Sequence, residues 1–143
     1  MDVVVFEHEN PAFEAALDIR ERVFVDEQEV PYDREVDGRD PEATHFLGRV
    51  DGEPTAVARL REYEETAVKV ERVAVVAAKR GEGYGDELMD VVETHASEAG
   101  YDRVVLDAQV PVVDFYKRRG YALQDDEPFE DAGIPHRRMA KPV

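Results

Sequence analysis

The sequence predicts a mixed α/β domain in which several strands follow one another directly. Short apolar runs rich in β-branched residues, bounded by turn residues, predict strands, and apolar residues at helical spacing predict helices. The two kinds of segment are arranged in the order β-α-β-β-β-α-β-α-β-β, which is typical of a sheet flanked by helices. The chain has 143 residues, a length that one hydrophobic core usually serves, so we expect a single domain over residues 1–143.

The first half of the chain predicts one helix and a three-stranded meander. Asn10 is a good capping residue and Pro11 suits the first helical position, so a helix begins here. Residues 28–42 are polar and contain two prolines, which predicts a long ordered loop or short turns. Asp51 and Gly52 form a tight turn between two apolar runs and predict a hairpin. The strands expected in this half span residues 3–6, 46–50, 55–63 and 67–76.

The second half predicts two helices that alternate with strands. The first helix begins in the segment Gly81–Gly85 and ends before Gly100, a residue suited to a helix C-terminus. A shorter helix spans residues 111–119 and ends at Gly120. The apolar face of the longer helix contains Leu88, Met89, Val91, Val92 and Ala96. The strands expected in this half span residues 103–108, 121–123 and 135–139.

The composition excludes several classes of function. The chain carries 34 acidic and 18 basic side chains, a formal net charge of −16, so its surface should repel nucleic acid. It has no cysteine, which removes disulfides, thiolate nucleophiles and cysteine-ligated zinc. No apolar run approaches the roughly 18 residues that cross a bilayer, and no basic signal segment opens the chain. We therefore expect no nucleic-acid partner, no membrane partner and a cytoplasmic location.

The ratio of arginine to lysine is also unusual. Of the 18 basic residues, 14 are arginine and only 4 are lysine. Excess acid with few lysines is typical of proteins from salt-loving organisms, because a Debye length of about 3 Å in 1 M salt makes self-repulsion tolerable. The alternative is an ordinary protein with a basic partner.

The most informative segment is an apolar strand that runs through a glycine-rich turn into a helix. The strand at residues 70–76 is followed by Gly81, Gly83 and Gly85. The unpaired amides and positive dipole end of the helix make such a turn a candidate anion site, although it can also be an ordinary connection. It is no dinucleotide fingerprint, because Asp86 stands three residues after Gly83, and no Gly-Lys-Ser/Thr sequence of a P-loop is present.

Two ordered motifs resemble those of the GNAT acyl-CoA N-acyltransferases. Arg80-x-x-Gly83-x-Gly85 resembles motif A, and the segment from Gln109 to Tyr121, which contains Phe115-Tyr116, resembles motif B. Residues 23–31 and 133–136 resemble an ElaA/YjcF-like subgroup of that family. The resemblance covers nearly the whole chain. It implies a mixed, mostly antiparallel twisted sheet flanked by helices and splayed at its centre.

The resemblance also implies a binding site for acetyl-CoA. In the family, the strand before motif A bonds the pantetheine arm through its backbone, and the glycine turn bonds the pyrophosphate. Carried over to this chain, the cofactor-binding residues are Val73, Ala74, Val75, Arg80, Gly81, Glu82, Gly83, Tyr84, Gly85, Gln109 and Tyr116. Two departures are Gln109, where the family usually has asparagine, and the acidic Asp86-Glu87 in the first helical turn.

Local charge agrees with this assignment. Residues 69–80 contain four basic and one acidic side chain, a net charge of +3, and residues 109–120 contain three and one, a net charge of +2. Both windows stand out in an acidic chain, although chance clustering of solvated side chains is the alternative for the second. No metal is expected, because the loop at Asp33-x-Glu35-x-Asp37-Gly38 lacks the twelfth-position Glu of a calcium loop.

The resemblance implies that Tyr116 is the general acid that protonates the leaving thiolate, although packing is its alternative role. Glu71 is a candidate general base and could equally be held in a salt bridge. His45 and His136 are runners-up, because an imidazole titrates near neutral pH. The residues expected to bind the acceptor are Glu27, Asp37, His45 and His136.

The resemblance therefore implies an N-acetyltransferase that moves an acetyl group from acetyl-CoA directly to a primary amine of a small molecule or peptide. The alternative is a catalytically silent sensor or interaction module that binds coenzyme A. A homodimer is possible, since members of the family often dimerise.

Overall fold

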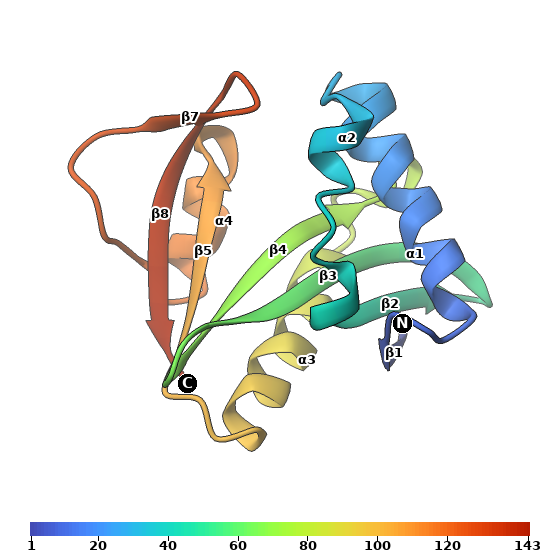
Figure 1. Cartoon of the computed structure of the whole chain (residues 1–143), viewed down its shortest axis with the longest axis horizontal. Coiled ribbons are helices and arrows are strands. Elements are labelled where there is room, and N and C mark those ends of the chain that lie inside the picture. The colour runs from blue at the N-terminus through green and yellow to red at the C-terminus, as the bar shows by residue number, and fades with distance from the viewer.

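A single eight-stranded sheet runs through the molecule. The computed structural model describes all 143 residues. The strand order is β1-β2-β3-β4-β5-β8-β6, and β7 pairs with β8 outside this path (Figure 1). The strands are β1 (Asp2–Glu7), β2 (Thr44–Val50), β3 (Glu53–Glu64), β4 (Ala67–Val75), β5 (Arg103–Gln109), β6 (Ala122–Leu123), β7 (Phe129–Asp131) and β8 (Ile134–Pro142).

Helices cover both faces of the sheet. The α-helices are α1 (Ala12–Arg20), α2 (Tyr32–Glu35), α3 (Tyr84–Glu98) and α4 (Val113–Arg118). A π-helical segment, η1 (Glu21–Glu27), continues α1, and short 3₁₀ turns are η2 (Asp40–Glu42), η3 (Ala77–Lys79) and η4 (Val110–Val112). Figure 1 shows α1 and α2 on one side of the sheet and α3 on the other. None of the helices is long and apolar enough to cross a bilayer.

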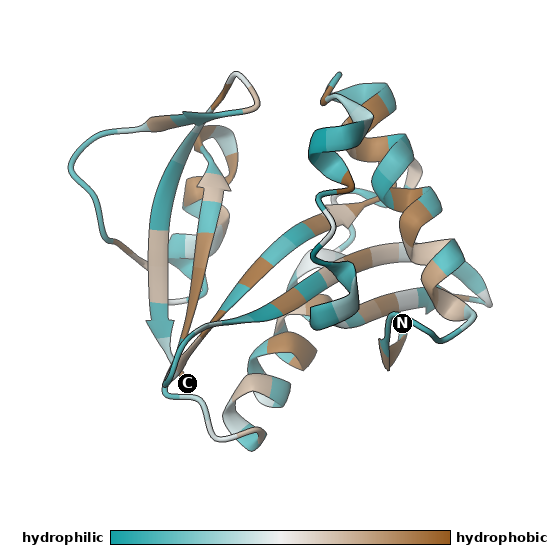
Figure 2. Ribbon diagram, in the orientation of Figure 1, coloured by the Kyte–Doolittle hydropathy of each residue, from teal (hydrophilic) through white to brown (hydrophobic).

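Two hydrophobic cores lie on the two faces of the sheet. The larger core packs Leu88, Met89, Val92 and Ala96 of α3 against the strands, which confirms the apolar face predicted for this helix. The smaller core packs α1 against the other face, where Ile19 is fully buried. Successive residues of a strand point to opposite faces, so the central strands supply both cores, and apolar and polar bands alternate along them in Figure 2.

The sheet splays open at its centre, as the resemblance implied. Strands β4 and β5 form the parallel pair of the sheet, with Ala67–Val70 aligned against Arg103–Leu106. Beyond Val70 and Leu106 the two strands have no pairing with each other, and Figure 1 shows them diverging into a V. The fold is thus a mixed, mostly antiparallel sheet flanked by helices and is not a closed barrel.

Two predicted connections contain more structure than expected. The loop at residues 28–42 includes α2 and η2, each only three or four residues long and each beginning beside a proline. Strand β7 was not predicted, because Phe-Glu-Asp is short and mostly polar. It forms through a tight turn at Ala132 and Gly133, whose φ angles of 54° and 76° suit a hairpin.

A buried ion-pair cluster fixes the loop after η1 against the sheet. Arg20, at the end of α1, bonds Glu35 and Asp40 at 2.8 Å each. Arg59 of β3 bonds the same Asp40 at 3.1 Å. The segment that contains α2 and η2 is therefore tied to the sheet as well as to α1. The side chains of Arg20, Glu35 and Asp40 are only 2%, 1% and 5% exposed. Each charge is therefore tolerated inside the protein only because its partners are present.

Removing Arg20 should destabilise the protein strongly. The Arg20→Ala change removes the basic side chain that Glu35 and Asp40 share and leaves these buried carboxylates only Arg72 and Arg59 as partners. Breaking a buried ion pair typically costs about 3–5 kcal/mol in the free energy of unfolding. Urea denaturation followed by circular dichroism measures this. The matched control is Arg22→Ala, since Arg22 and its partner Asp18 are 54% and 64% exposed and the loss should stay within about 1 kcal/mol. Equal losses for the two variants would contradict the role given to the buried cluster.

Candidate functional site

The splay between β4 and β5 opens a cavity of about 880 Å³. Its wall is built from both halves of the sheet, from η1 and α2, and from the start of α3. The predicted site residues that line it are Asp37, Glu71, Val73, Ala74, Val75, Arg80, Gly81, Gly83, Tyr84, Gly85, Gln109, Tyr116 and His136. Most of the residues selected from the sequence are therefore brought to one place, although they come from five helices and strands and from two loops.

One end of the cavity is the glycine turn that precedes α3. Gly83 stands immediately before the helix with a φ of 87°, and Gly81 has a φ of 82°. A Cβ placed on either would meet no atom within 4 Å, so the space over the turn is open. The first amides of α3 have no partner within the helix and carry the positive end of its dipole. The turn can therefore accept an anionic group at close range.

The last glycine of the turn, Gly85, lies against α4. A Cβ on Gly85 would lie 3.4 Å from the ring of Phe115, which is van der Waals contact, so α4 packs against the first turn of α3 at this point. This contact places motif B beside motif A.

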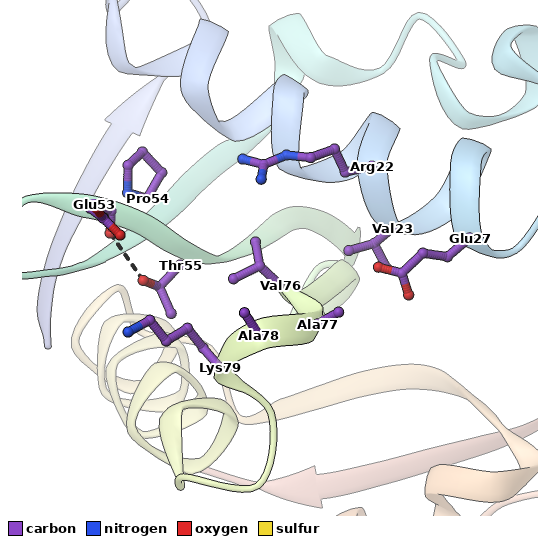
Figure 3. A pocket seen from close by; sticks show the side chains of 10 residues that line it. All are labelled: Arg22, Val23, Glu27, Glu53, Pro54, Thr55, Val76, Ala77, Ala78 and Lys79. Carbon is purple, nitrogen blue, oxygen red and sulfur yellow. Dashed lines mark hydrogen bonds between the residues drawn. The ribbon is translucent and has the colours of Figure 1, made fainter.

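Arg80 and Glu27 are paired with each other in the structure. The Arg80 Nε donates to the Val75 carbonyl at 2.9 Å, and its Nη2 lies 2.8 Å from Glu27 of η1. The guanidinium expected to face a pyrophosphate is thus already engaged. Glu27 lines a second, smaller hollow of about 490 Å³ on the outer side of η3, shown in Figure 3, and not the main cavity. The exposed Glu82 does not line the main cavity either.

One of the three basic side chains in the second motif window is engaged inside the protein. The Arg119 side chain is 9% exposed and bonds Asp86, Asp90 and Glu93 of α3 at 2.8–3.1 Å. The other two, Lys117 and Arg118, are exposed and form no ion pair. The contact of Arg119 pairs Asp86 with a basic side chain. The negative charge of Asp86 in the first turn of α3 is thereby offset at the place where an anion would approach.

Strand β4 is distorted at the point where it leaves β5. Arg72 has a φ of 58°, and the register with β3 shifts between Val57 and Arg59. The two features describe a β-bulge, which re-aims the strand and exposes backbone groups. From Glu71 to Val75 the side of β4 that faces β5 has no strand partner, so its peptide groups border the cavity.

Tyr116 lies in α4 with its side chain almost fully buried, 7% exposed, in edge-to-face contact with Phe115 and Tyr121. It nevertheless contributes to the cavity wall. Burial raises the pKa of the Tyr116 phenol well above its usual value, and no hydrogen bond opposes that shift. The group is therefore protonated at neutral pH, as a proton donor has to be. Tyr116 thus packs among aromatic side chains and also borders the cavity, so its position is compatible with both roles expected from the sequence, packing residue and general acid.

Comparison with known proteins connects this geometry to a family. The family model of the GNAT acetyltransferase domain matches residues 14–143. The chain belongs to the GNAT acetyltransferase family. YjcF of Bacillus subtilis, an uncharacterised N-acetyltransferase, is 36% identical over 126 residues that cover 88% of this chain and 89% of YjcF. The protein is thus an acyltransferase by family.

Solved structures of other GNAT proteins have the same fold. ElaA of Escherichia coli superimposes with a TM-score of 0.87 at 32% identity, and the match covers 98% of each chain. An acyl-CoA N-acyltransferase of Pseudomonas aeruginosa superimposes with a TM-score of 0.86, also at 32% identity and 98% coverage of each. The resemblance to an ElaA/YjcF-like subgroup is confirmed by these relatives.

The two candidate histidines have different positions in this GNAT fold. His45 of β2 is buried between Phe6 and Phe13, and its Nε2 lies 3.0 Å from the Asp40 carbonyl. It does not line the cavity, so its placement gives no support to the expected acceptor contact: it fills a niche between α1 and the sheet. His136 of β8 does line the cavity.

Sequence reasoning missed two contacts that cross the mouth of the cavity. The Gln109 amide donates to Gln28, the residue after η1, at 2.8 Å, and Arg34 of α2 pairs with Asp131 of β7 at 3.1 Å. Both join the half of the molecule that contains α1 to the half that contains β8. Gln28 lies in a segment that carried the family resemblance, but no spacing rule indicates a partner 81 residues away.

The carboxylates of the cavity are held ionised by basic neighbours. Burial alone would raise the pKa of Glu71, but hydrogen bonding from Arg61 and the charge of Arg59 outweigh it and lower that pKa. The pKa of Asp107 is lowered in the same way, because Arg138 and Lys69 bond it at 2.8 and 3.0 Å. Glu71 is thus salt-bridged, as one of its two predicted readings had it, although with β3 residues and Lys69 and not with Arg72.

These pairs should make the protein less stable in acid. In the unfolded chain the pKa values are 4.5 for Glu71 and 3.8 for Asp107, and folding lowers both. Such groups stabilise the fold fully at a pH above the unfolded pKa. Their contribution is lost as pH falls through the folded pKa. We expect the free energy of unfolding to stay level from pH 7 to about 5 and to drop below about pH 4. Urea titrations at each pH measure it.

The Glu71→Gln variant is the control for this acid sensitivity. It removes one titrating group while keeping an oxygen that accepts from arginine, so its stability should fall less steeply below pH 4. Relief of the overall negative charge by protonation affects both proteins equally and cancels in the comparison. Identical slopes for the two proteins would mean that Glu71 is not held by its arginines.

Proposed function

We propose that the protein transfers an acetyl group from acetyl-CoA to a primary amine of a small molecule or peptide. The observation that carries the proposal is the continuity of the cavity, which joins the glycine turn before α3 to Tyr116 and to a carboxylate-rich half at α2. The printed names of two relatives, an N-acetyltransferase and an acyl-CoA N-acyltransferase, agree with this activity. The family's fold alone does not identify the acceptor.

The residues present fit acetyl-CoA. The open glycine turn at Gly81 and Gly83 suits a pyrophosphate, and the unpaired edge of β4 from Val73 to Val75 suits the amide groups of a pantetheine arm. Lys79 lines both the cavity and the adjoining hollow. In this proposal acetyl-CoA supplies an activated thioester, and the chain's task is to orient it and to move protons.

Tyr116 acts as the general acid in the proposed reaction. A thiolate leaving group resembles that of cysteine, with a pKa of about 8.5, so it accepts a proton from a phenol only when the donor is held close in a partly dry site. The aromatic contacts around Tyr116 and its position in the cavity wall provide that setting.

The amine enters from the half of the cavity lined by α2 and β7. Glu35, Asp37 and Asp131 line that half together with Arg34 and Arg72. Each acid there is bonded to a basic side chain, so the half is polar without a large excess of either charge. Asp37 remains the predicted acceptor-binding residue. Glu71 is less suited to act as a base than the sequence suggested, because its lowered pKa weakens its affinity for a proton.

Thiol release from acetyl-CoA in the presence of amines tests the activity. The panel is spermidine, lysine, kanamycin and a tripeptide with a free N-terminus, each assayed at low and at molar KCl. We expect turnover with at least one amine. The Tyr116→Phe variant should lose about 10-fold or more in kcat with unchanged affinity for acetyl-CoA, since a general acid contributes about 10²–10⁴-fold.

Two results would contradict the proposal. If the wild type binds acetyl-CoA, acetylates none of the amines, and Tyr116→Phe binds equally well, a silent coenzyme A sensor accounts for the protein better. If Tyr116→Phe keeps full turnover, Tyr116 is a packing residue and another group donates the proton.

The pyrophosphate assignment is tested separately at Gly83. The Gly83→Glu change puts a carboxylate over the open turn and should weaken acetyl-CoA binding about 100-fold or more, measured by calorimetry, because a like charge meets the anion. Gly52→Glu is the matched control. Gly52 has a similar φ of 80° and equally open surroundings, but it lies in the β2–β3 turn away from the cavity. Unchanged affinity in Gly83→Glu would show that the phosphates bind elsewhere.

A further inference from the structure

We propose that His136 is the general base of the acetyl transfer, and that the Ile134 carbonyl sets the tautomer that makes it one. The inference rests on the proposed function, since it assigns a role within that reaction. Its evidence is the geometry around His136 on β8, beside the point where β5 ends.

His136 is fixed on two sides. Its Nδ1 lies 2.7 Å from the carbonyl oxygen of Ile134, two residues earlier on the same strand. Its ring stacks on Phe129 of β7, with centroids 5.9 Å apart and planes 24° from parallel. The side chain is half-buried and forms part of the cavity wall. The imidazole is therefore oriented before any ligand binds.

The contact with Ile134 decides which nitrogen can accept a proton. A carbonyl oxygen accepts hydrogen bonds and cannot donate them, so Nδ1 has to carry the hydrogen. In the neutral imidazole the lone pair then belongs to Nε2, which no residue of the protein engages. This is the arrangement in which a carbonyl bonded to one ring nitrogen prepares the other as a base.

Every carboxylate that lines the cavity is already bonded to a basic side chain. Glu71 and Asp107 are bonded by arginine and lysine, and their lowered pKa values oppose protonation. Asp37 is held by Arg59 through two oxygens at 2.9 Å each. His136 is the one imidazole in the cavity wall, and its Nε2 has no hydrogen-bond partner in the protein.

The charged groups around His136 are balanced. On β7, Asp131 is paired with Arg34 of α2, and Glu130 is exposed beside it. On β5, Asp107 is paired with Arg138 and Lys69. The neighbouring Gln109, which aligns with His136 across the β5–β8 pair, is neutral. Of the nearby carboxylates, Asp107 and Asp131 are thus each paired with a basic side chain, and Glu130 is exposed to solvent.

An ammonium group of the acceptor gives one proton to Nε2, and the freed nitrogen lone pair forms the C–N bond to the thioester carbon. The C–S bond breaks with its electron pair passing to sulfur, which takes the phenolic proton of Tyr116. The second proton on the new amide nitrogen restores Tyr116, and the imidazolium of His136 returns its proton to solvent.

The test compares pH profiles of acetyl transfer for the wild type, His136→Asn and His8→Asn, with the most reactive amine of the panel. Asparagine keeps a donor near the Nδ1 position for the Ile134 carbonyl but has no basic nitrogen. We expect a loss of about 100-fold in kcat and disappearance of the acidic limb of the profile, with acetyl-CoA affinity unchanged. His8 contacts Phe13 outside the cavity, so its variant should behave as the wild type.

An amine that needs no deprotonation separates a base from a positioning residue. Hydroxylamine is uncharged at neutral pH, so the penalty of His136→Asn should shrink with it. A penalty of the same size for both amines would overturn the base assignment.

A second measurement does not depend on turnover. Long-range ¹H–¹⁵N correlation spectra of the protein saturated with coenzyme A report which ring nitrogen carries the hydrogen, and His136→Asn assigns the signal. We expect a protonated Nδ1 and a bare Nε2 in the neutral ring, and the opposite tautomer would overturn the inference. If the wild type acetylates an amine but His136→Asn keeps the same kcat and the acidic limb of the pH profile, the role of His136 as base fails and the proposed function stands. If the wild type acetylates nothing, the proposed function fails and the role with it.

Discussion

The pairing between β4 and β5 extends over only four residues on each strand, and the site depends on where it stops. A strand that leaves its neighbour loses hydrogen bonds that a continuous sheet would keep. In exchange, β4 presents peptide groups to a cavity, and the start of α3 and the end of β5 come to lie on its two sides. The bulge at Arg72 and the packing of Phe115 on Gly85 hold this opening in place.

Acidic residues have different functions on the surface and in the interior of the protein. The net charge of −16 describes the surface, whereas the interior uses arginine to join acidic loop residues to strands. Arg20 and Arg59 fix the segment that carries α2, and Arg119 neutralises the first turn of α3. Of the basic residues in the two motif windows, Arg72, Arg80 and Arg119 thus hold parts of the protein together, whereas Lys79, Lys117 and Arg118 form no ion pair.

The sequence indicated the fold and most of the cavity wall because those depend on local pattern. Alternating apolar residues, the glycine turn and the two motifs are short-range features, and they placed Gly83, Gln109 and Tyr116 correctly in one cavity. His45 lies outside this cavity because it is buried between α1 and β2, a long-range outcome that no spacing reveals. The pairing of Arg80 with Glu27, and of Gln109 with Gln28, could not be predicted for the same reason: each joins segments that meet only in the folded chain.

The splay leaves the protein with an internal edge strand. An unpaired edge at the rim of a sheet is a template on which other chains can add and aggregate. Here the unpaired edge of β4 faces β5 across the cavity, inside the sheet and not at its outer rim. In the proposed function, an extended ligand with amide groups of its own takes the place of the missing strand. The fold thus keeps peptide groups available to a ligand without lengthening the outer edge on which other chains could add.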